Sequence, residues 1–276
     1  MSIDKRVPLN NGVQMPQFGL GVFQSKEGSE VEKAVRSAID FGYRHIDTAA
    51  IYGNEEGTGK AVRDSGIARE EMFITTKVWN SAQREGTVRE AFEESLRKLD
   101  IGYIDLYLVH WAVEGKYVDT WLTLEKLMAE GKVKAIGVSN FYEHHFDDVL
   151  AAGSMVPAVN QVELHPYLRL EGLHNYLKDK GCYIEAWSPL AQARPELFGN
   201  PVLQTIAEEH SKTVAQVILR WHWQHDIVII PKSVKPHRIA ENGSIFDFEL
   251  SAAEMSAIDG LDRNERNGPH PDNCDF

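Results

Sequence analysis

Short strand-like runs alternate with helix-like segments along nearly the whole chain of 276 residues. The helix-like segments, such as those within 31–39, 88–99 and 214–221, repeat apolar residues at spacings of three and four. The strand-like runs are shorter and end at turn residues. The eight runs are Phe18–Val22, Arg44–Asp47, Met72–Lys77, Ile104–His110, Val133–Val138, Ala158–Val162, Tyr183–Trp187 and Ile227–Pro231.

Strict alternation of strand and helix is typical of a parallel sheet joined by right-handed crossovers. Such a sheet either stays open, as in doubly wound folds, or closes into a barrel, and periodicity does not separate the two. The count of eight favours an α/β fold of the (β/α)8 TIM-barrel type. The segment VPLNNGVQM at 7–15 places Asn-Gly between apolar runs, which predicts a hairpin. Because no linker rich in Pro, Gly or Ser divides the chain, we expect one domain over residues 1–276.

Four side chains with acid–base chemistry stand at or near the ends of three successive runs. Asp47, Lys77 and His110 end the second, third and fourth runs, and Tyr52 follows the second run in the sequence. Enzymes with a parallel barrel gather their chemistry at the carboxyl ends of the strands, so we expect these side chains to converge. A carboxylate, a phenol, an ammonium and an imidazole together suit proton donation to a carbonyl oxygen.

Reduction of a carbonyl group by hydride requires a proton for the nascent alkoxide. A phenol, with an ordinary pKa near 10, is protonated at neutral pH. It releases its proton if an ammonium stabilises the phenolate and a buried carboxylate keeps that ammonium charged. Tyr52, Lys77 and Asp47 fit these three roles. His110 can donate a hydrogen bond that polarises the carbonyl oxygen.

Each of these residues also has an ordinary structural interpretation. Asp47 can cap a turn, Tyr52 can pack beside the turn that follows it, and His110 can be a core histidine. Lys77 is harder to explain in this way, because lysine is almost never buried unless it is paired. For any one residue alone the structural interpretation is the commoner one, whereas the four together, in order, favour a site.

Composition excludes several classes of partner. The chain has 29 basic and 41 acidic residues and a formal charge of −12, which argues against binding to a nucleic-acid backbone. Its two cysteines, Cys182 and Cys274, indicate no disulfide framework and fit a reducing compartment. No signal-like segment and no apolar stretch of about 20 residues is present. We therefore expect a cytoplasmic monomer without nucleic-acid or membrane partners.

Seven motifs occur in order: GYRHIDTAAIYGNEE, ITTK, LVHW, GVSNF, AVNQVELHP, EAWSPL and IPKSVKPHRIAEN. Together they resemble the aldo-keto reductase superfamily over nearly the whole chain. The chain is most similar to the branch that contains glyoxal and methylglyoxal reductases, 2,5-diketo-D-gluconate reductases and prostaglandin F synthases. The resemblance implies that the hairpin closes the bottom of the barrel. It also implies that Asp47, Tyr52, Lys77 and His110 are the catalytic residues of an NADPH-dependent reduction of aldehydes and ketones.

The cofactor is not expected to bind in the Rossmann manner, because no Gly-x-Gly-x-x-Gly follows a predicted strand. Lys232, Ser233 and Arg238 suit the 2′-phosphate of NADPH, although a solvated basic patch at a helix start is an alternative. The resemblance implies the other contacts: Glu241 and Asn242 to the adenine; Ser139, Asn140 and Gln161 to the nicotinamide carboxamide; Trp187 to its ring; Ser188 and Leu190 to the pyrophosphate; and Gly21 and Phe23 to the cofactor cleft.

The substrate side is expected to be aromatic. By resemblance, Phe23, Trp79 and Trp111 form an apolar wall beside His110, and the tail after Arg266 closes the pocket. Packing at the barrel rim explains these aromatic residues equally well. The expected substrates are small dicarbonyls, keto sugars and aromatic aldehydes.

Two other functions remain open from the sequence. One is a metal-dependent hydrolase that uses His45, Asp47 and His110, although no further ligands with suitable spacing accompany them and we expect no metal. The other is a non-catalytic barrel that binds NADPH and docks on a partner protein as a redox sensor. The complete set of four catalytic residues favours the reductase.

Overall fold

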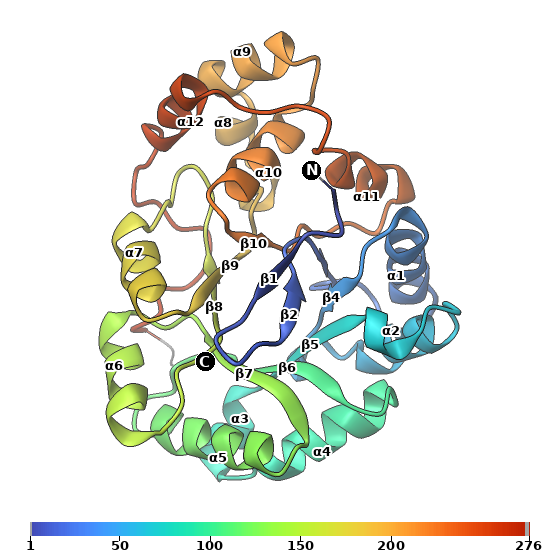
Figure 1. Ribbon diagram of the computed structural model, residues 1–276, viewed down its shortest axis with the longest axis vertical. Coiled ribbons are helices and arrows are strands. Elements are labelled where there is room, and N and C mark those ends of the chain that lie inside the picture. Colours follow the sequence, from blue (N-terminus) through green and yellow to red (C-terminus); the bar gives the residue numbers. More distant parts are fainter. Residues whose placement is uncertain (1, 274–275) are drawn as a thin grey trace.

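The computed structural model describes residues 2–273 and 276, and its centre is a closed parallel barrel. Eight strands follow one another in the order β3 to β10, each parallel to the next. Isolated bridges from Phe18 to Ile229 and from Gly21 to Lys232 join the first of these strands to the last. Helices surround the strands (Figure 1). The predicted (β/α)8 barrel is confirmed, and the open sheet is excluded.

The predicted runs match the strands of the barrel closely, but the first and last are reduced to two residues each, with bridges carrying the rest of their pairing. The strands are β1 (Arg6–Pro8), β2 (Gln14–Pro16), β3 (Leu20–Gly21), β4 (His45–Asp47), β5 (Phe73–Val78), β6 (Ile104–Val109), β7 (Val133–Ser139), β8 (Val159–Glu163), β9 (Tyr183–Trp187) and β10 (Val228–Ile229). The α-helices are α1 (Ser29–Phe41), α2 (Glu55–Arg63), α3 (Asn80–Glu85), α4 (Val88–Leu99), α5 (Tyr117–Ala129), α6 (Glu143–Ala152), α7 (Glu171–Asp179), α8 (Pro195–Phe198), α9 (Pro201–Glu209), α10 (Val214–Gln224), α11 (Pro236–Gly243) and α12 (Ala252–Asp259). Short 3-10 turns are η1 (Ala50–Tyr52), η2 (Arg69–Glu71) and η3 (Ala191–Ala193).

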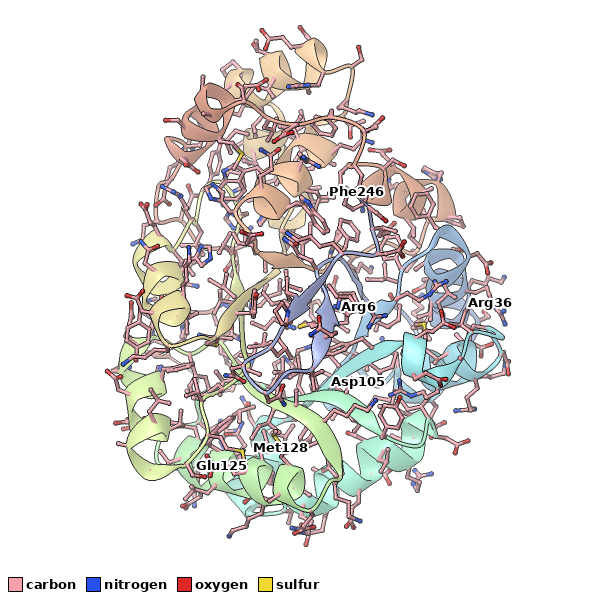
Figure 2. The ribbon with its side chains drawn as sticks, viewed as in Figure 1. Arg6, Arg36, Asp105, Glu125, Met128 and Phe246 are labelled. Carbon is pink, nitrogen blue, oxygen red and sulfur yellow. The ribbon has the colours of Figure 1, made fainter. Side chains whose placement is uncertain are left out.

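The hairpin of β1 and β2 covers the amino-terminal end of the barrel, which faces the viewer in Figure 1. Val7 pairs with Met15 across the hairpin, and both pack in a buried cluster with apolar residues from β5, β6, β7, β8 and β10. Arg6, labelled in Figure 2, donates a hydrogen bond of 2.8 Å to the carbonyl of Glu71, at the end of the turn η2 that precedes the third barrel strand. The predicted hairpin therefore closes the bottom of the barrel.

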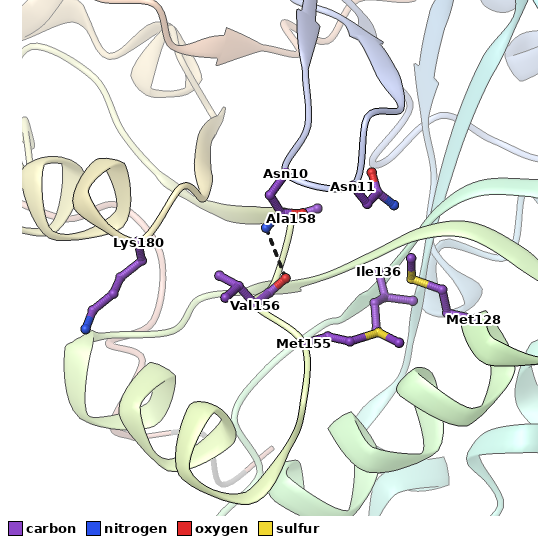
Figure 3. Close-up of a pocket in the computed structure, with 8 residues that line it drawn as sticks. All are labelled: Asn10, Asn11, Met128, Ile136, Met155, Val156, Ala158 and Lys180. Atoms are coloured by element: carbon purple, nitrogen blue, oxygen red, sulfur yellow. Dashed lines mark hydrogen bonds between the residues drawn. The ribbon is translucent and has the colours of Figure 1, made fainter.

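A cavity of about 260 Å³ lies beside the tip of this hairpin (Figure 3). Asn10 donates a hydrogen bond of 3.1 Å to the carbonyl of Val156, and Met128 and Met155 line the apolar side. The cavity is at the amino ends of the strands, whereas the predicted catalytic residues are at the carboxyl ends. It is therefore separate from the candidate active site.

Alternate residues of each strand point into the barrel, and their character changes along its axis. On β5, Phe73 belongs to the apolar cluster at the bottom. Two residues further on, Thr75 contacts His45, and after two more Lys77 reaches the carboxyl end of the barrel. The interior of the barrel is thus apolar at the amino ends of the strands and charged at their carboxyl ends.

The structure bears on two expectations drawn from composition. Cys182 is buried directly before β9, and burial raises the pKa of its thiol well above the ordinary value, which does not suit a nucleophile. Cys274 lies outside the described residues. No helix in the described part of the chain is long and apolar enough to cross a membrane.

Gly59 allows α2 to approach the end of α4. A Cβ atom at this position would lie 1.9 Å from the backbone oxygen of Leu99, a distance that no packed side chain tolerates. The short run GTG at 57–59 is therefore explained by helix packing.

We predict that Gly59→Ala lowers the free energy of unfolding by about 1–3 kcal/mol, the usual cost of overpacking. This loss is expected even though alanine favours a helix over glycine by up to about 1 kcal/mol. Urea unfolding monitored by tryptophan fluorescence measures the change. Gly172→Ala on α7 is the matched control, since a Cβ there meets nothing within 4 Å. A Gly59→Ala protein as stable as the control would contradict the packing argument.

Candidate active site

Lys77 and Asp47 form a buried ion pair at the carboxyl end of neighbouring strands. The Lys77 ammonium donates hydrogen bonds of 2.7 Å to Asp47 Oδ1 and 2.8 Å to the carbonyl oxygen of Thr48. The two side chains are only 0% and 3% exposed. The pairing follows from the fold, because β4 and β5 are adjacent and both residues point inward.

The charges of this pair are mutually dependent. Burial alone would lower the pKa of Lys77, but the charges of Asp47 and Tyr52 and the hydrogen bond to Asp47 raise it above its ordinary value. Burial raises the pKa of Asp47, while the Lys77 ammonium and the hydrogen bonds from Lys77 and Gln161 oppose this rise. Lys77 therefore keeps its proton and stays cationic.

Tyr52 lies against this cation. The Lys77 Nζ atom is 5.1 Å from the centroid of the Tyr52 ring, and this ring stands edge-on to that of His110 at 5.8 Å. Tyr52 belongs to the 3-10 turn η1, which follows β4 directly. Burial raises the pKa of the phenol, and the Lys77 charge partly lowers it again. The phenol is therefore protonated at neutral pH, with a cation beside it to stabilise the phenolate.

His110 is neutral in this site. Burial, followed by the charge of Lys77, lowers the pKa of His110 well below its ordinary value. Its Nδ1 atom is buried and has no hydrogen-bond partner among the described residues, while its carbonyl oxygen accepts a hydrogen bond of 3.0 Å from Asn140 Nδ2. A neutral imidazole with one N–H group is suited to donate a hydrogen bond to a carbonyl oxygen.

Several residues assigned to the nicotinamide by resemblance meet at the same rim. The hydroxyl of Ser139 donates a hydrogen bond of 2.8 Å to the carbonyl of Gln161, and Trp187 Nε1 donates one of 2.8 Å to Asn140 Oδ1. Asn140 has a φ of 60°, in the left-handed region that asparagine tolerates better than most residues. These side chains thus form one connected edge beside the Lys77 pair.

A basic cluster follows β10, at the place predicted for the 2′-phosphate. Lys232 and Arg238 are exposed, and Ser233 is buried between them and accepts a hydrogen bond of 3.1 Å from the backbone of Lys235. Within residues 2–273 and 276, no carboxylate lies within 4.0 Å of the charged groups of Lys232, Lys235 and Arg238. Unpaired cations near the start of a helix, in a chain of charge −12, fit a phosphate group.

At the remaining positions assigned to the cofactor, the structure shows contacts and backbone conformations that do not by themselves indicate a ligand. Glu241 and Asn242 lie on α11, where Glu241 already accepts a hydrogen bond of 2.9 Å from Thr213. Ser188 follows β9 with a φ of 48° and opens the turn that contains Leu190. A Cβ atom at Gly21 would lie 2.8 Å from a backbone oxygen of the last strand segment, so closure of the barrel alone requires glycine there.

Aromatic rings surround the four central residues. Phe23 is 52% exposed and its ring lies 4.9 Å from that of Tyr52, while Trp79 stands edge-on to His110 at 5.1 Å. Trp111 is buried, and its ring contacts that of Phe276 at 5.2 Å. The tail after Arg266 was expected to close the pocket, but Phe276 was not singled out among the predicted site residues.

The tail is fixed to the barrel mouth through Glu163, the last residue of β8. The backbone N–H groups of Asn267 and Gly268 donate hydrogen bonds of 2.7 and 3.0 Å to the two oxygens of this buried carboxylate. Gly268 lies so close to Trp187 that a Cβ atom would come within 2.4 Å of its ring. The tail therefore borders the position at which the nicotinamide ring is expected.

The structure gives no support to the metal-dependent hydrolase. His45 lies deeper in the barrel, with Nε2 3.0 Å from Thr75 Oγ1, and does not gather with Asp47 and His110. Among the described residues the one group with suitable ligand spacing is His144, His145 and Asp272, outside the barrel.

The bonding of His145 argues against a metal at that group. Its Nδ1 atom accepts a hydrogen bond of 3.2 Å from the backbone of Tyr142, so a neutral ring carries its proton on Nε2. This Nε2 atom lies 3.6 Å from Asp272 Oδ1, so it faces the carboxylate as a donor. The group therefore ties the tail to α6.

A polar layer lies directly below the ion pair, and of its members the sequence singled out only His45, as a possible metal ligand, and missed Thr75 and Glu185. His45, Thr75 and Glu185 are all buried inside the barrel, and Glu185 Oε2 accepts a hydrogen bond of 2.9 Å from Gln161. Strand alternation carries the signal that identifies them, because each lies two residues before a residue of the site and points to the same side.

Comparisons with known proteins agree with this geometry. Residues 17–263 match the model of the "Aldo/keto reductase family". The chain is 55% identical to the glyoxal reductase of Bacillus subtilis, covering 100% of this chain and 99% of the relative. It is 50% identical to the 9,11-endoperoxide prostaglandin H2 reductase of Trypanosoma cruzi, covering 97% and 95% of the two chains.

A solved structure of a mutant of Gox0644 in complex with NADPH superposes with a TM-score of 0.93, at 41% identity and 98% coverage of both chains. The family match spans most of the chain, and both relatives belong to the branch that the motifs indicated. The chain therefore belongs to the aldo/keto reductase family.

Proposed function

We propose that this chain, as a single barrel, reduces small aldehydes and ketones with NADPH and that Tyr52 donates the proton. The observation that carries the proposal is the buried Lys77–Asp47 ion pair beside the Tyr52 phenol. The names of the relatives, a glyoxal reductase and a prostaglandin H2 reductase, support a reductase. They disfavour the alternative, a non-catalytic barrel that senses redox state.

The residues of the chain supply and control the proton. As the Tyr52 phenol releases its proton to the developing alkoxide, the Lys77 ammonium stabilises the phenolate. Asp47 keeps Lys77 charged and oriented. His110, held neutral by burial, donates its N–H to the carbonyl oxygen and places the carbonyl carbon toward the cofactor.

NADPH supplies the hydride that the carbonyl carbon receives. The solved relative that binds NADPH and the unpaired basic cluster after β10 both support this cofactor. The proposed contacts are Ser139, Asn140 and Gln161 to the carboxamide; Trp187 to the ring; Ser188 and Leu190 to the pyrophosphate; Lys232, Ser233 and Arg238 to the 2′-phosphate; Glu241 and Asn242 to the adenine; and Gly21 and Phe23 along the cleft.

The proposed substrates are small dicarbonyls, keto sugars and aromatic aldehydes. The aromatic wall of Phe23, Trp79 and Trp111 offers apolar contacts and few hydrogen bonds, so discrimination between small carbonyls is expected to be modest.

We further propose that the protein acts as a cytoplasmic monomer without nucleic-acid or membrane partners. Its charge of −12 and its buried thiol support this setting.

Tyr52→Phe is predicted to lower kcat by roughly 10²- to 10⁴-fold, the usual contribution of a positioned general acid. The Kd for NADPH, measured by quenching of protein fluorescence, is expected to stay close to the wild-type value. Tyr117→Phe on α5 is the matched control and should turn over normally. Wild-type turnover by Tyr52→Phe would refute the assignment of the proton donor.

Arg238→Met is predicted to raise the Kd for NADPH by roughly 10- to 150-fold, since a charged hydrogen bond contributes about 1.5–3 kcal/mol. The Kd for NADH is expected to change little, because NADH has no 2′-phosphate. Arg97→Met on α4 removes a cation far from β10 and should affect neither cofactor. Equal weakening of both cofactors in Arg238→Met would show that Arg238 does not read the phosphate.

Asp47→Asn and Lys77→Met are each predicted to destabilise the fold by about 3–5 kcal/mol, because each leaves a buried charge without its partner. The double variant should be less destabilised than the sum of the singles, by about 1 kcal/mol or more. Urea unfolding of the four proteins measures this coupling. The exposed Arg89–Glu130 pair provides a comparison cycle with much weaker coupling. Additive single effects at the buried pair would contradict the ion-pair argument.

A further inference from the structure

Glu185 is a buried carboxyl group that the proposed chemistry leaves without a role. It lies on β9, two residues before Trp187, and its side chain is fully buried inside the barrel. Its Oε2 atom accepts a hydrogen bond of 2.9 Å from Gln161 Nε2. The same nitrogen donates a hydrogen bond of 2.8 Å to Asp47 Oδ2. Glu185 and the carboxylate that orients Lys77 are therefore bridged by one amide.

This bridge fixes the orientation of the Gln161 amide. Both hydrogens of Nε2 are used, one by each carboxyl group, so a rotated amide would lose both hydrogen bonds and place its own oxygen against the Asp47 carboxylate. The Oε1 atom is then the end that remains to receive a donor. With Asp47 alone, only one of the two hydrogens would be held. The hydrogen bond to Glu185 therefore fixes the orientation of the Gln161 amide, and with it the position of the acceptor atom Oε1.

The protonation states follow from the surrounding charges. Two buried carboxyl groups share one cation, and Lys77 lies 2.7 Å from Asp47. The nearest imidazole to Glu185 is that of His45, 3.8 Å away, which stays neutral because burial lowers its pKa to about 3. Burial and the charge of Asp47 raise the pKa of Glu185 to about 8. The carboxyl group of Glu185 therefore carries a proton at neutral pH.

We propose that Glu185 acts as a positioning residue. It holds the Gln161 amide in the orientation in which Gln161 Oε1 accepts a hydrogen bond from the carboxamide N–H of the nicotinamide. The inference rests on the proposed roles of Gln161 and Asp47. Neutral Glu185 leaves Lys77 with a single counter-charge. When Glu185 ionises, the second negative charge raises the pKa values of Tyr52 and Lys77, so the phenol becomes a poorer proton donor.

Two substitutions separate the hydrogen bond from the charge. Glu185→Gln keeps an acceptor for Gln161 and is neutral at every pH. It should retain wild-type kcat at pH 7 and lack the decline of kcat that is expected of the wild type as pH rises past about 8. Glu185→Leu fills the space without an acceptor. It should raise the Kd for NADPH and lower kcat by about 10-fold or more, the usual cost of losing a group that orients a contact residue.

Glu55→Gln is the matched control. Glu55 is also a buried carboxyl group with a raised pKa, but it bonds Thr76 on the outside of the barrel at 2.7 Å. Its amide variant should keep the wild-type pH profile. The proposal is overturned if Glu185→Leu and Glu185→Gln share the wild-type kcat, Kd and pH profile.

A stability measurement tests the buried proton without any turnover. The folded-state pKa of Glu185 is about 8 and its ordinary value is 4.5, so the folded wild type loses stability as pH rises between these values. Glu185→Gln lacks this loss, and its advantage in Tm over the wild type should grow from about pH 4.5 to 8 and then level off. A Tm difference that does not change with pH overturns the protonation of Glu185. A wild-type protein that does not oxidise NADPH with any small aldehyde or ketone would instead refute the proposed function while leaving this stability result intact.

Discussion

The ion pair between Lys77 and Asp47 is the interaction on which the site depends. A charged amine inside a barrel is costly unless a partner and hydrogen bonds replace the lost water. Here the partner comes from the adjacent strand and a further acceptor from the backbone of Thr48. Because strand order places these groups next to each other, the parallel barrel is a condition for the chemistry as well as a scaffold for it.

The polar upper half of the barrel is possible because the lower half is apolar and sealed. The hairpin brings Val7, Leu9 and Met15 against the bottom of the barrel, where a packed cluster excludes water. The layer of His45, Thr75 and Glu185 then separates this cluster from the ion pair. A low-dielectric surrounding strengthens the attraction within the pair and keeps His110 neutral, so packing far from the substrate helps to set the charges near it.

The sequence predicted the parts of the molecule that local patterns determine. The alternation of strand and helix predicted a parallel sheet, and the count of eight runs favoured the barrel. The position of Lys77 at the end of an apolar strand predicted a buried, paired lysine, which the structure places beside Asp47. Glu185 was missed because it lies within the EAWSPL motif, where only the inward orientation of alternate residues on β9 distinguishes it from its neighbours. Phe276 was missed because its position results from contacts with Trp79 and Trp111, which are distant in sequence. Predictions about tertiary contacts of this kind need the fold first.

The barrel closes where the segment before β3 pairs with β10, and these two segments come from opposite ends of the chain. Tyr52, Lys77 and His110 all come from the first half of the chain, yet the barrel that buries them closes only when Phe18 pairs with Ile229 near the other end. Contacts between such distant segments form slowly, because a long loop must be ordered first. During synthesis, the ionisable residues therefore exist long before the surroundings that shift their pKa values. The buried ion pair and the neutral imidazole arrive only when the barrel closes, as properties of the finished fold.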